Sequence, residues 1–137
     1  MMIGAEALVR WRHPELGLIP PSVFIPVLEE NKMITRLDLY VFEYTCRFIR
    51  KCLDENLHII PISTNCSRPD IFIENFVEQL EEIRKKYDVP VRFLRVEITE
   101  SVAVKGEENV NNVVAKLHQY GYIVEMDDFG SGYSSLN

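Results

Sequence analysis

Two adjacent carboxylates, Asp127 and Asp128, follow a strand-like run and precede a loop that contains Gly130 and Gly132. Successive strand residues point to opposite faces, so neighbouring aspartates can reach the same cations only where the strand ends and the backbone turns. The two glycines permit such a turn. The pair is therefore predicted to lie at the rim of a sheet, in an arrangement typical of metal sites.

Three further oxygen-bearing residues, Glu6, Asn65 and Glu97, each end another apolar, strand-like run. Asn65, Glu97 and Asp127 stand 32 and 30 residues apart, close to the roughly 30 residues of one strand and its crossover helix. The longer interval after Glu6 accommodates a proline-rich loop and a short extra helix at about 13–31. Because the C-terminal ends of neighbouring parallel strands converge on one face of a β/α barrel, this spacing predicts one shared site.

The predicted ligands favour a particular class of metal. Three carboxylates beside an amide suit a hard cation such as Mg²⁺ or Mn²⁺, whereas zinc would call for His or Cys ligands. Taken alone, Asp127 and Asp128 could be a turn or helix-capping pair. The presence of Glu6, Asn65 and Glu97 in the same register favours metal binding.

The elements expected to position this site alternate between strands and helices. Thr35 and Asp38 are predicted to form a capping box at the start of the longest helix, and Gly121 to end the last helix. No linker or low-complexity tract interrupts the pattern, which indicates one α/β domain over residues 1–137, folded as part of a TIM-like barrel. Apolar periodicity predicts strands at about 2–9, 59–65, 91–98 and 122–127 and helices at about 22–30, 33–54, 69–86 and 106–120.

Composition excludes several classes of protein. A net charge of −6 argues against a protein that coats nucleic acid, whose binding surface is strongly basic. Glu6 interrupts the N-terminus before any signal-peptide core, and no apolar run approaches the ~20 residues of a membrane span. The odd number of cysteines, without CxxC spacing, favours reduced, buried thiols and a cytoplasmic location.

Several motifs together resemble the EAL domain family, and the similarity runs in order from about residue 3 to residue 136. Members are bacterial phosphodiesterases that use two Mg²⁺ or Mn²⁺ ions, in a modified TIM barrel, to open cyclic di-GMP to the linear dinucleotide. The motifs that carry the resemblance are Glu6-Ala7-Leu8-Val9-Arg10-Trp11, His13-Pro14, Phe24-Ile25-Pro26, Asn65-Cys66-Ser67, Glu97-Ile98-Thr99-Glu100 and the run from Asp127 to Leu136.

The resemblance implies a role for each matching residue. The first metal ion would be bound by Glu6, Asn65, Glu97 and Asp127, and Asp127 would bridge to the second ion. Asp128 would reach the second ion or its water.

The resemblance also implies residues around the metal site. Leu8 and Arg10 would contact the substrate, although Arg10 could also be only a solvated charge at a strand end. Glu100 would hold the loop, although it could equally be a first-turn acid that interacts with a helix dipole. The implied catalytic residues are Glu6, Glu100, Asp127 and Asp128, and the implied loop residues are Phe129, Gly130, Ser131, Gly132, Tyr133 and Ser134.

The sequence also departs from the family pattern. Family strands after the aspartate loop bring a lysine that positions the attacking water, a further metal-binding glutamate and a glutamine near the substrate, and none is present here. A whole barrel takes roughly 250 residues, so we expect about half a barrel that is inactive alone. The alternatives are a non-catalytic cyclic di-GMP receptor, or a structural remnant that associates with itself through its open sheet edges.

Strand alternation predicts a second polar layer that no motif supplies. Counting back two residues from each predicted ligand keeps the same face, which places Gly4, Ser63, Arg95 and Glu125 one layer deeper. An unpaired interior charge would be costly. Arg95 and Glu125 are therefore expected to form an ion pair, with Gly4 and Ser63 leaving room for it.

Overall fold

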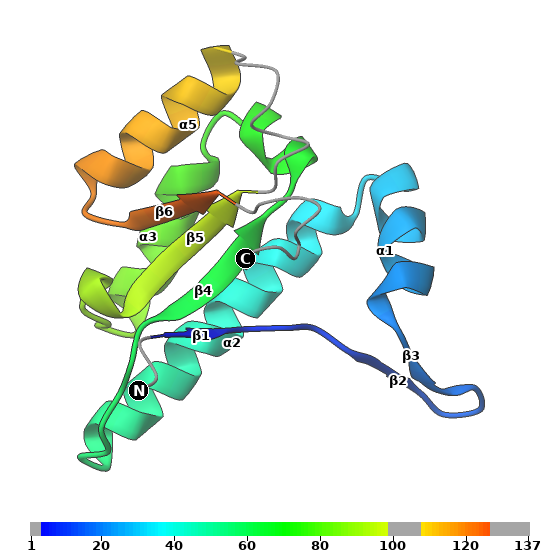
Figure 1. The fold of residues 1–137 in the computed structure, drawn as a ribbon, viewed down its shortest axis with the longest axis horizontal. Coiled ribbons are helices and arrows are strands. Elements are labelled where there is room, and N and C mark those ends of the chain that lie inside the picture. The colour runs from blue at the N-terminus through cyan, green and yellow to red at the C-terminus, as the bar shows by residue number, and fades with distance from the viewer. Residues whose placement is uncertain (1–3, 99–107, 127–137) are drawn as a thin grey trace.

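A computed structural model describes residues 4–98 and 108–126. Four parallel strands form one sheet in the order β1-β4-β5-β6, as expected for consecutive β/α units (Figure 1). Connections between consecutive elements are usually short, and sequential strands are therefore commonly neighbours in a sheet. The predicted partial β/α barrel is confirmed at the level of this sheet, whose strands are β1 (Ala5–Glu6), β4 (Ile62–Cys66), β5 (Leu94–Ile98) and β6 (Ile123–Met126).

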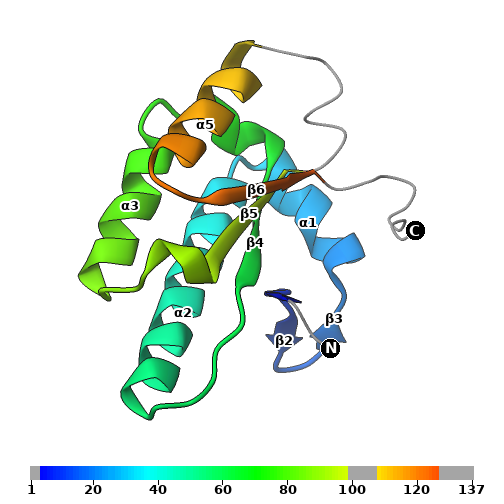
Figure 2. The ribbon, with the colours of Figure 1, turned by 60° about the vertical axis from the view of Figure 1, so that its left-hand side comes forward.

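Three helices cover one side of the sheet, here called its outer face (Figures 1 and 2). They are α2 (Ile34–Asp54), α3 (Phe76–Lys86) and α5 (Glu108–Gln119). Alternate strand residues face these helices, and the buried ones are apolar or small. The resulting core includes Phe42, Ile49, Cys66, Phe76, Leu80, Leu94, Val96, Ile98, Val113 and Leu117.

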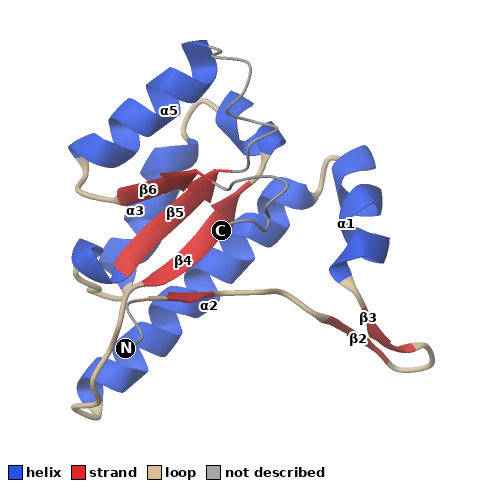
Figure 3. Ribbon diagram, viewed as in Figure 1, coloured by secondary structure: helices blue, strands red, loops and turns tan. Residues whose placement is uncertain are grey.

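The opposite side of the sheet, here called the inner face, carries the other strand residues. No described helix lies across it in the views of Figures 1 and 3. Its side chains are mainly polar, in contrast to the apolar outer face. The residues of the inner face are Glu6, Ser63, Asn65, Arg95, Glu97, Ile123 and Glu125.

The proline-rich segment after β1 is more ordered than the sequence predicted. Instead of a loop, β2 (Trp11–His13) and β3 (Gly17–Ile19) form an antiparallel hairpin that leads into α1 (Pro21–Glu30). The imidazole Nδ1 of His13 accepts bonds from the backbone N–H groups of Glu15 and Leu16 at 3.1 Å, which closes the turn. Gly17 follows with φ +78°, a conformation that favours glycine.

Three other expectations about local structure were wrong. The helix expected at 69–86 is divided into a 3₁₀ turn, η1 (Arg68–Phe72), and α3, and another 3₁₀ turn, η2 (Val91–Phe93), precedes β5. Strand β1 is shorter than expected. The capping box predicted from Thr35 and Asp38 is absent, because both side chains bond to the segment after β4 instead.

The expectations for Gly121 and for the cysteines were confirmed. Gly121, with φ +98°, follows α5 and allows the chain to turn into β6. Cys46, Cys52 and Cys66 are buried free thiols. Within the described residues, none of the helices combines the length and apolar character that a membrane crossing requires.

Candidate metal centre at the strand ends

Glu6, Asn65 and Glu97 lie on the inner face near the C-terminal ends of β1, β4 and β5. Glu6 is the last residue of its strand, and Asn65 and Glu97 each precede the last. Because the strands are parallel, all three belong to one edge of the sheet. Asn65 and Glu97 are direct partners in the register. The structure thus brings these three predicted ligands to neighbouring positions.

The strands are staggered in register, so the predicted ligands do not all lie at one height, and neither do the residues predicted one layer deeper. Glu6 is the register partner of Ser63, one inner-face position before Asn65. Likewise Glu125 is level with Glu97 and not with Arg95. Strands in a barrel tilt against the axis and shift in register, so equal counting from each ligand does not give equal height.

The donors that the structure describes fit a hard cation in chemical type. Two carboxylates and one amide present only oxygen ligands toward a metal, as Mg²⁺ and Mn²⁺ prefer. Across residues 4–98 and 108–126, no group of three or more His, Cys, Asp or Glu side chains could hold a metal ion. Asp127, Asp128, Glu100 and the predicted loop 129–134 lie outside the described residues, so the full ligand set stays a prediction.

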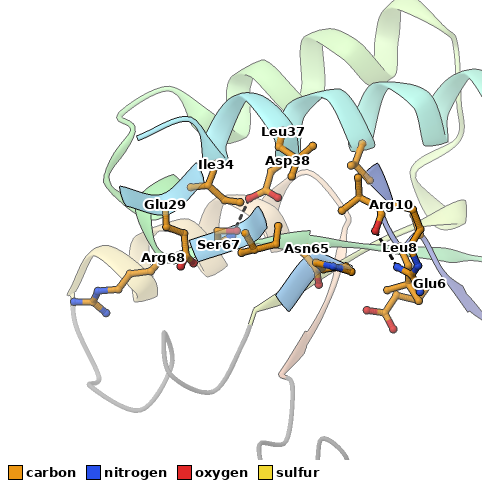
Figure 4. A pocket seen from close by; sticks show the side chains of 15 residues that line it. Glu6, Leu8, Arg10, Glu29, Ile34, Leu37, Asp38, Asn65, Ser67 and Arg68 are labelled. Atoms are coloured by element: carbon orange, nitrogen blue, oxygen red, sulfur yellow. Dashed lines mark hydrogen bonds between the residues drawn. The ribbon is translucent and has the colours of Figure 1, made fainter. Parts of the chain in front are cut away.

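A cavity of about 380 Å³ opens beside these residues (Figure 4). Glu6, Leu8, Arg10 and Asn65 all line it, so the predicted substrate contacts border two of the predicted ligands. The Arg10 guanidinium is exposed and its Nη1 donates to the Val9 carbonyl at 2.8 Å. The cavity lined by Glu6 is thus also lined by a positively charged side chain, Arg10, that an anionic ligand could contact.

Two buried aspartates hold the chain that follows Asn65. The backbone N–H of Ser67 donates to Asp38 Oδ2 at 3.2 Å and to Asp70 Oδ2 at 2.9 Å. Thr35 Oγ1 donates to Asp70 Oδ1 at 2.6 Å. These bonds connect α2 to the end of β4 and so fix the backbone two residues beyond Asn65. Figure 4 shows the bond between Ser67 and Asp38.

The same contacts change the acidity of Asp38. Its pKa is raised to about 9, first by burial and then by the hydrogen bond to Asp70 and the negative charge of Asp70. The carboxyl group of Asp38 therefore keeps its proton at neutral pH. This pair was not predicted from the sequence. The capping-box spacing of Ser67 and Asp70 indicates the bond between those two residues, but no local pattern indicates the contact with Asp38.

The predicted ion pair between Arg95 and Glu125 is confirmed. Arg95 Nη1 lies 3.2 Å from Glu125 Oε2, and Ser63 Oγ donates to Glu125 Oε1 at 2.7 Å. Gly4 provides space, because a Cβ there would lie 2.8 Å from Arg95 Nη1. The pair is more open than expected, with 21% and 37% of the Arg95 and Glu125 side chains exposed.

Comparison with known proteins yields one family. The model of the EAL domain matches residues 1–137. The chain is 33% identical over 135 residues to the bifunctional diguanylate cyclase/cyclic di-GMP phosphodiesterase MucR of Pseudomonas aeruginosa, covering 98% of this chain and 20% of that protein. It is 33% identical over 131 residues to the cyclic di-GMP phosphodiesterase NbdA of the same organism, covering 96% and 17%.

Solved structures agree with this similarity. The PaMucR phosphodiesterase in complex with c-di-GMP has a TM-score of 0.88 and 33% identity, over 99% of this chain and 55% of that one. The EAL enzyme Bd1971 in its cGMP-bound form has a TM-score of 0.82 and 27% identity, over 97% and 38%. The chain thus spans about half of the first structure and about a fifth of the two curated relatives.

Proposed function

Because the chain belongs to the EAL domain family, we propose that it contributes one half of a metal-dependent phosphodiesterase domain that hydrolyses cyclic di-GMP. The observation that carries this proposal is the placement of Glu6, Asn65 and Glu97 on one face and one edge of a parallel sheet. Relatives named as cyclic di-GMP phosphodiesterases, at 33% identity, support the same reaction.

In this proposal, Glu6, Asn65, Glu97 and Asp127 hold one divalent cation, Mg²⁺ or Mn²⁺, and Asp127 and Asp128 extend to a second. Bound in such a pair, these cations polarise a phosphodiester and supply hydroxide near neutral pH. Because all of the proposed ligand atoms are oxygens, the site favours Mg²⁺ or Mn²⁺ over metals that prefer thiolate or imidazole ligands.

The other residues orient the substrate and the site. Arg10, exposed beside the cavity, pairs with a phosphate of the cyclic dinucleotide, and Leu8 packs against it. Asp38 and Asp70, through the Ser67 amide, keep the end of β4 and hence Asn65 in place. Water adds to phosphorus, one P–O bond of the ring breaks, and the departing oxygen takes up a proton to give the linear dinucleotide.

A hydrolysis assay tests the proposal in a polypeptide where this chain continues through the rest of the barrel. Asn65→Ala and Glu97→Gln are expected to reduce Mn²⁺-dependent turnover of cyclic di-GMP by at least about 100-fold, because loss of a residue that only supports a metal ligand already costs about 10–100-fold. Glu82→Gln, the same change on the exposed side of α3, serves as the control. Full activity in the Asn65 and Glu97 variants would refute the proposed site.

The receptor alternative predicts a different result in the same polypeptide. A receptor would bind cyclic di-GMP, as the PaMucR complex does, without producing the linear dinucleotide in Mg²⁺ or Mn²⁺. Product analysis after prolonged incubation separates these two functions.

A further inference from the structure

Glu125 is a carboxylate in the same row as two of the proposed metal ligands. In the register of the sheet, Glu125 on β6 is the partner of Glu97 on β5, and Glu97 is the partner of Asn65 on β4. All three lie on the inner face. The backbone therefore presents Glu125 beside the candidate metal centre, although no family motif includes it.

The side chain of Glu125 is nevertheless directed elsewhere. Both of its oxygens bond one row deeper in the sheet, Oε1 with the Ser63 hydroxyl at 2.7 Å and Oε2 with Arg95 Nη1 at 3.2 Å. Ser63 and Arg95 are themselves register partners. The carboxylate thus points away from the strand ends at which Asn65 and Glu97 lie.

We propose that Arg95, assisted by Ser63, is a positioning residue that holds Glu125 out of the coordination sphere of the cation. This inference rests on the proposed metal site. Arg95 is the only cationic side chain among the described strand residues of the inner face, which also include three carboxylates, Glu6, Glu97 and Glu125. Its ion pair with Glu125 therefore decides whether that carboxylate can turn toward the metal.

The number of charged ligands matters because it tunes the affinity of a site for a hard cation. With Glu125 tied to Arg95, the described part of the site offers the carboxylates of Glu6 and Glu97 and the amide of Asn65. With Glu125 released, a further carboxylate becomes available beside Glu97. Release of Glu125 should tighten cation binding, and an additional bound carboxylate would also reduce the polarising power of the cation.

The test measures Mn²⁺ binding to the 137-residue chain by the loss of the free-ion electron paramagnetic resonance signal. Arg95→Met removes the partner of Glu125 and is expected to tighten Mn²⁺ binding on the order of tenfold, a size typical of changes around metal ligands. A damaged fold would weaken Mn²⁺ binding, so tighter binding in Arg95→Met cannot come from damage to the fold. Arg95→Lys, which keeps the charge, should restore affinity close to wild type.

A double-mutant cycle separates release of a ligand from the simple loss of a positive charge. If charge alone acts, Arg95→Met tightens binding by the same factor whether residue 125 is Glu or Gln. The proposal predicts that Arg95→Met tightens Mn²⁺ binding when residue 125 is Glu. In the Glu125→Gln background, the same substitution should change the Mn²⁺ affinity by a factor near one. Equal factors in the two backgrounds would overturn the proposal while leaving the metal site intact.

Two further results complete the test. If circular dichroism shows that Arg95→Met unfolds the chain, Ser63→Ala removes the shorter bond to Glu125 without a change in charge, and the same cycle with Glu125→Gln applies. Tighter Mn²⁺ binding in Ser63→Ala that depends on Glu125 supports the proposal, and an unchanged Mn²⁺ affinity overturns it. A wild-type chain without any Mn²⁺ binding sensitive to Asn65→Ala would overturn the metal site and this inference together.

Discussion

Arg84 and Glu81 form a two-bond ion pair within the fold, with Arg84 Nη2 2.7 Å from Glu81 Oε1 and Arg84 Nε 2.8 Å from Glu81 Oε2. Arg84 Nη1 also donates to the Val89 carbonyl at 3.0 Å. Val89 precedes the 3₁₀ turn that leads into β5, the strand that carries Glu97. This pair therefore fixes the entry of the strand at the end opposite the candidate metal centre.

Removing one partner of this pair should be costly. Glu81 is only 4% exposed, so Glu81→Gln leaves the guanidinium of Arg84 without its carboxylate. We expect the free energy of unfolding to fall by about 2–3 kcal/mol, less than the ~3–5 kcal/mol of a fully buried pair, because Arg84 retains some solvent contact.

Urea unfolding followed by circular dichroism measures the effect of Glu81→Gln. The control is Glu78→Gln on the same helix, which breaks an exposed pair with Lys116 at 3.2 Å. Its expected cost is below about 1 kcal/mol, as for most surface ion pairs. Equal losses in both variants would contradict the role assigned to Glu81.

The buried pair of Asp38 and Asp70 should make stability depend on pH. The pKa of Asp38 is about 9 in the folded chain against an ordinary value of 3.8, so between these values the folded state binds more protons than the unfolded state. The contribution of Asp38 to the free energy of unfolding is fully present below about pH 4 and is lost as the pH rises through about 9. Unfolding free energy from this source therefore decreases between pH 5 and pH 9.

The variant Asp38→Asn tests this pH dependence. The amide can donate to Asp70 and accept from the Ser67 amide, as the protonated acid does, but it does not titrate. Thermal melts from pH 5 to pH 9 should show a smaller decline for Asp38→Asn than for wild type. Asp54→Asn, at the exposed end of α2, should leave the wild-type slope unchanged. Identical slopes for all three chains would contradict the raised pKa of Asp38.

The 137-residue chain by itself should hydrolyse cyclic di-GMP very slowly. In the proposed mechanism, the second metal ion needs ligands from strands that follow this segment, and a two-metal site without one ligand set loses its clamp on the phosphodiester. Turnover with Mg²⁺ or Mn²⁺ is to be compared between this chain and a polypeptide that continues through the barrel. Comparable activity from a strictly monomeric 137-residue chain would contradict the mechanism.

The isolated chain should also associate with itself. β1 and β6 are the edge strands of the described sheet. The apolar side chain of Ile123, on the inner face of β6, is 48% exposed. Exposed strand edges and apolar surface promote association. Sedimentation velocity should show oligomers that Ile123→Lys reduces and that Leu57→Lys, a similar change in the segment between α2 and β4, does not. A wild-type monomer at high concentration would contradict the expectation.

Much of this fold follows from the sequence because strand and helix periods are strong local signals. The alternation around Asn65 and Glu97 predicted both the inner face and the pairing of Arg95 with Glu125. What alternation could not provide is the stagger between strands, since the relative height of Glu125 and Arg95 depends on the tilt of the whole sheet.

The wrong expectations for the capping box and for the segment after β1 also have physical reasons. Thr35 and Asp38 fit a local capping pattern, but burial against η1 gives them better partners in Asp70 and Ser67. A long-range contact therefore overrode a local propensity. The hairpin after β1 was missed because its turn is closed by the His13 side chain, which hydrophobic periodicity does not report.

The central claim is that Asn65, Glu97 and Glu6 are ligands of one divalent cation, and anomalous diffraction from Mn²⁺-soaked crystals tests it most directly. We predict an anomalous peak at the C-terminal edge of β1, β4 and β5, about 2.1 Å from side-chain oxygens of Asn65 and Glu97, close to the distance for small hard cations. The peak should vanish in crystals of Asn65→Ala. Strong Mn²⁺ peaks confined to other parts of the molecule, with none at this edge in wild-type crystals, would contradict the claim.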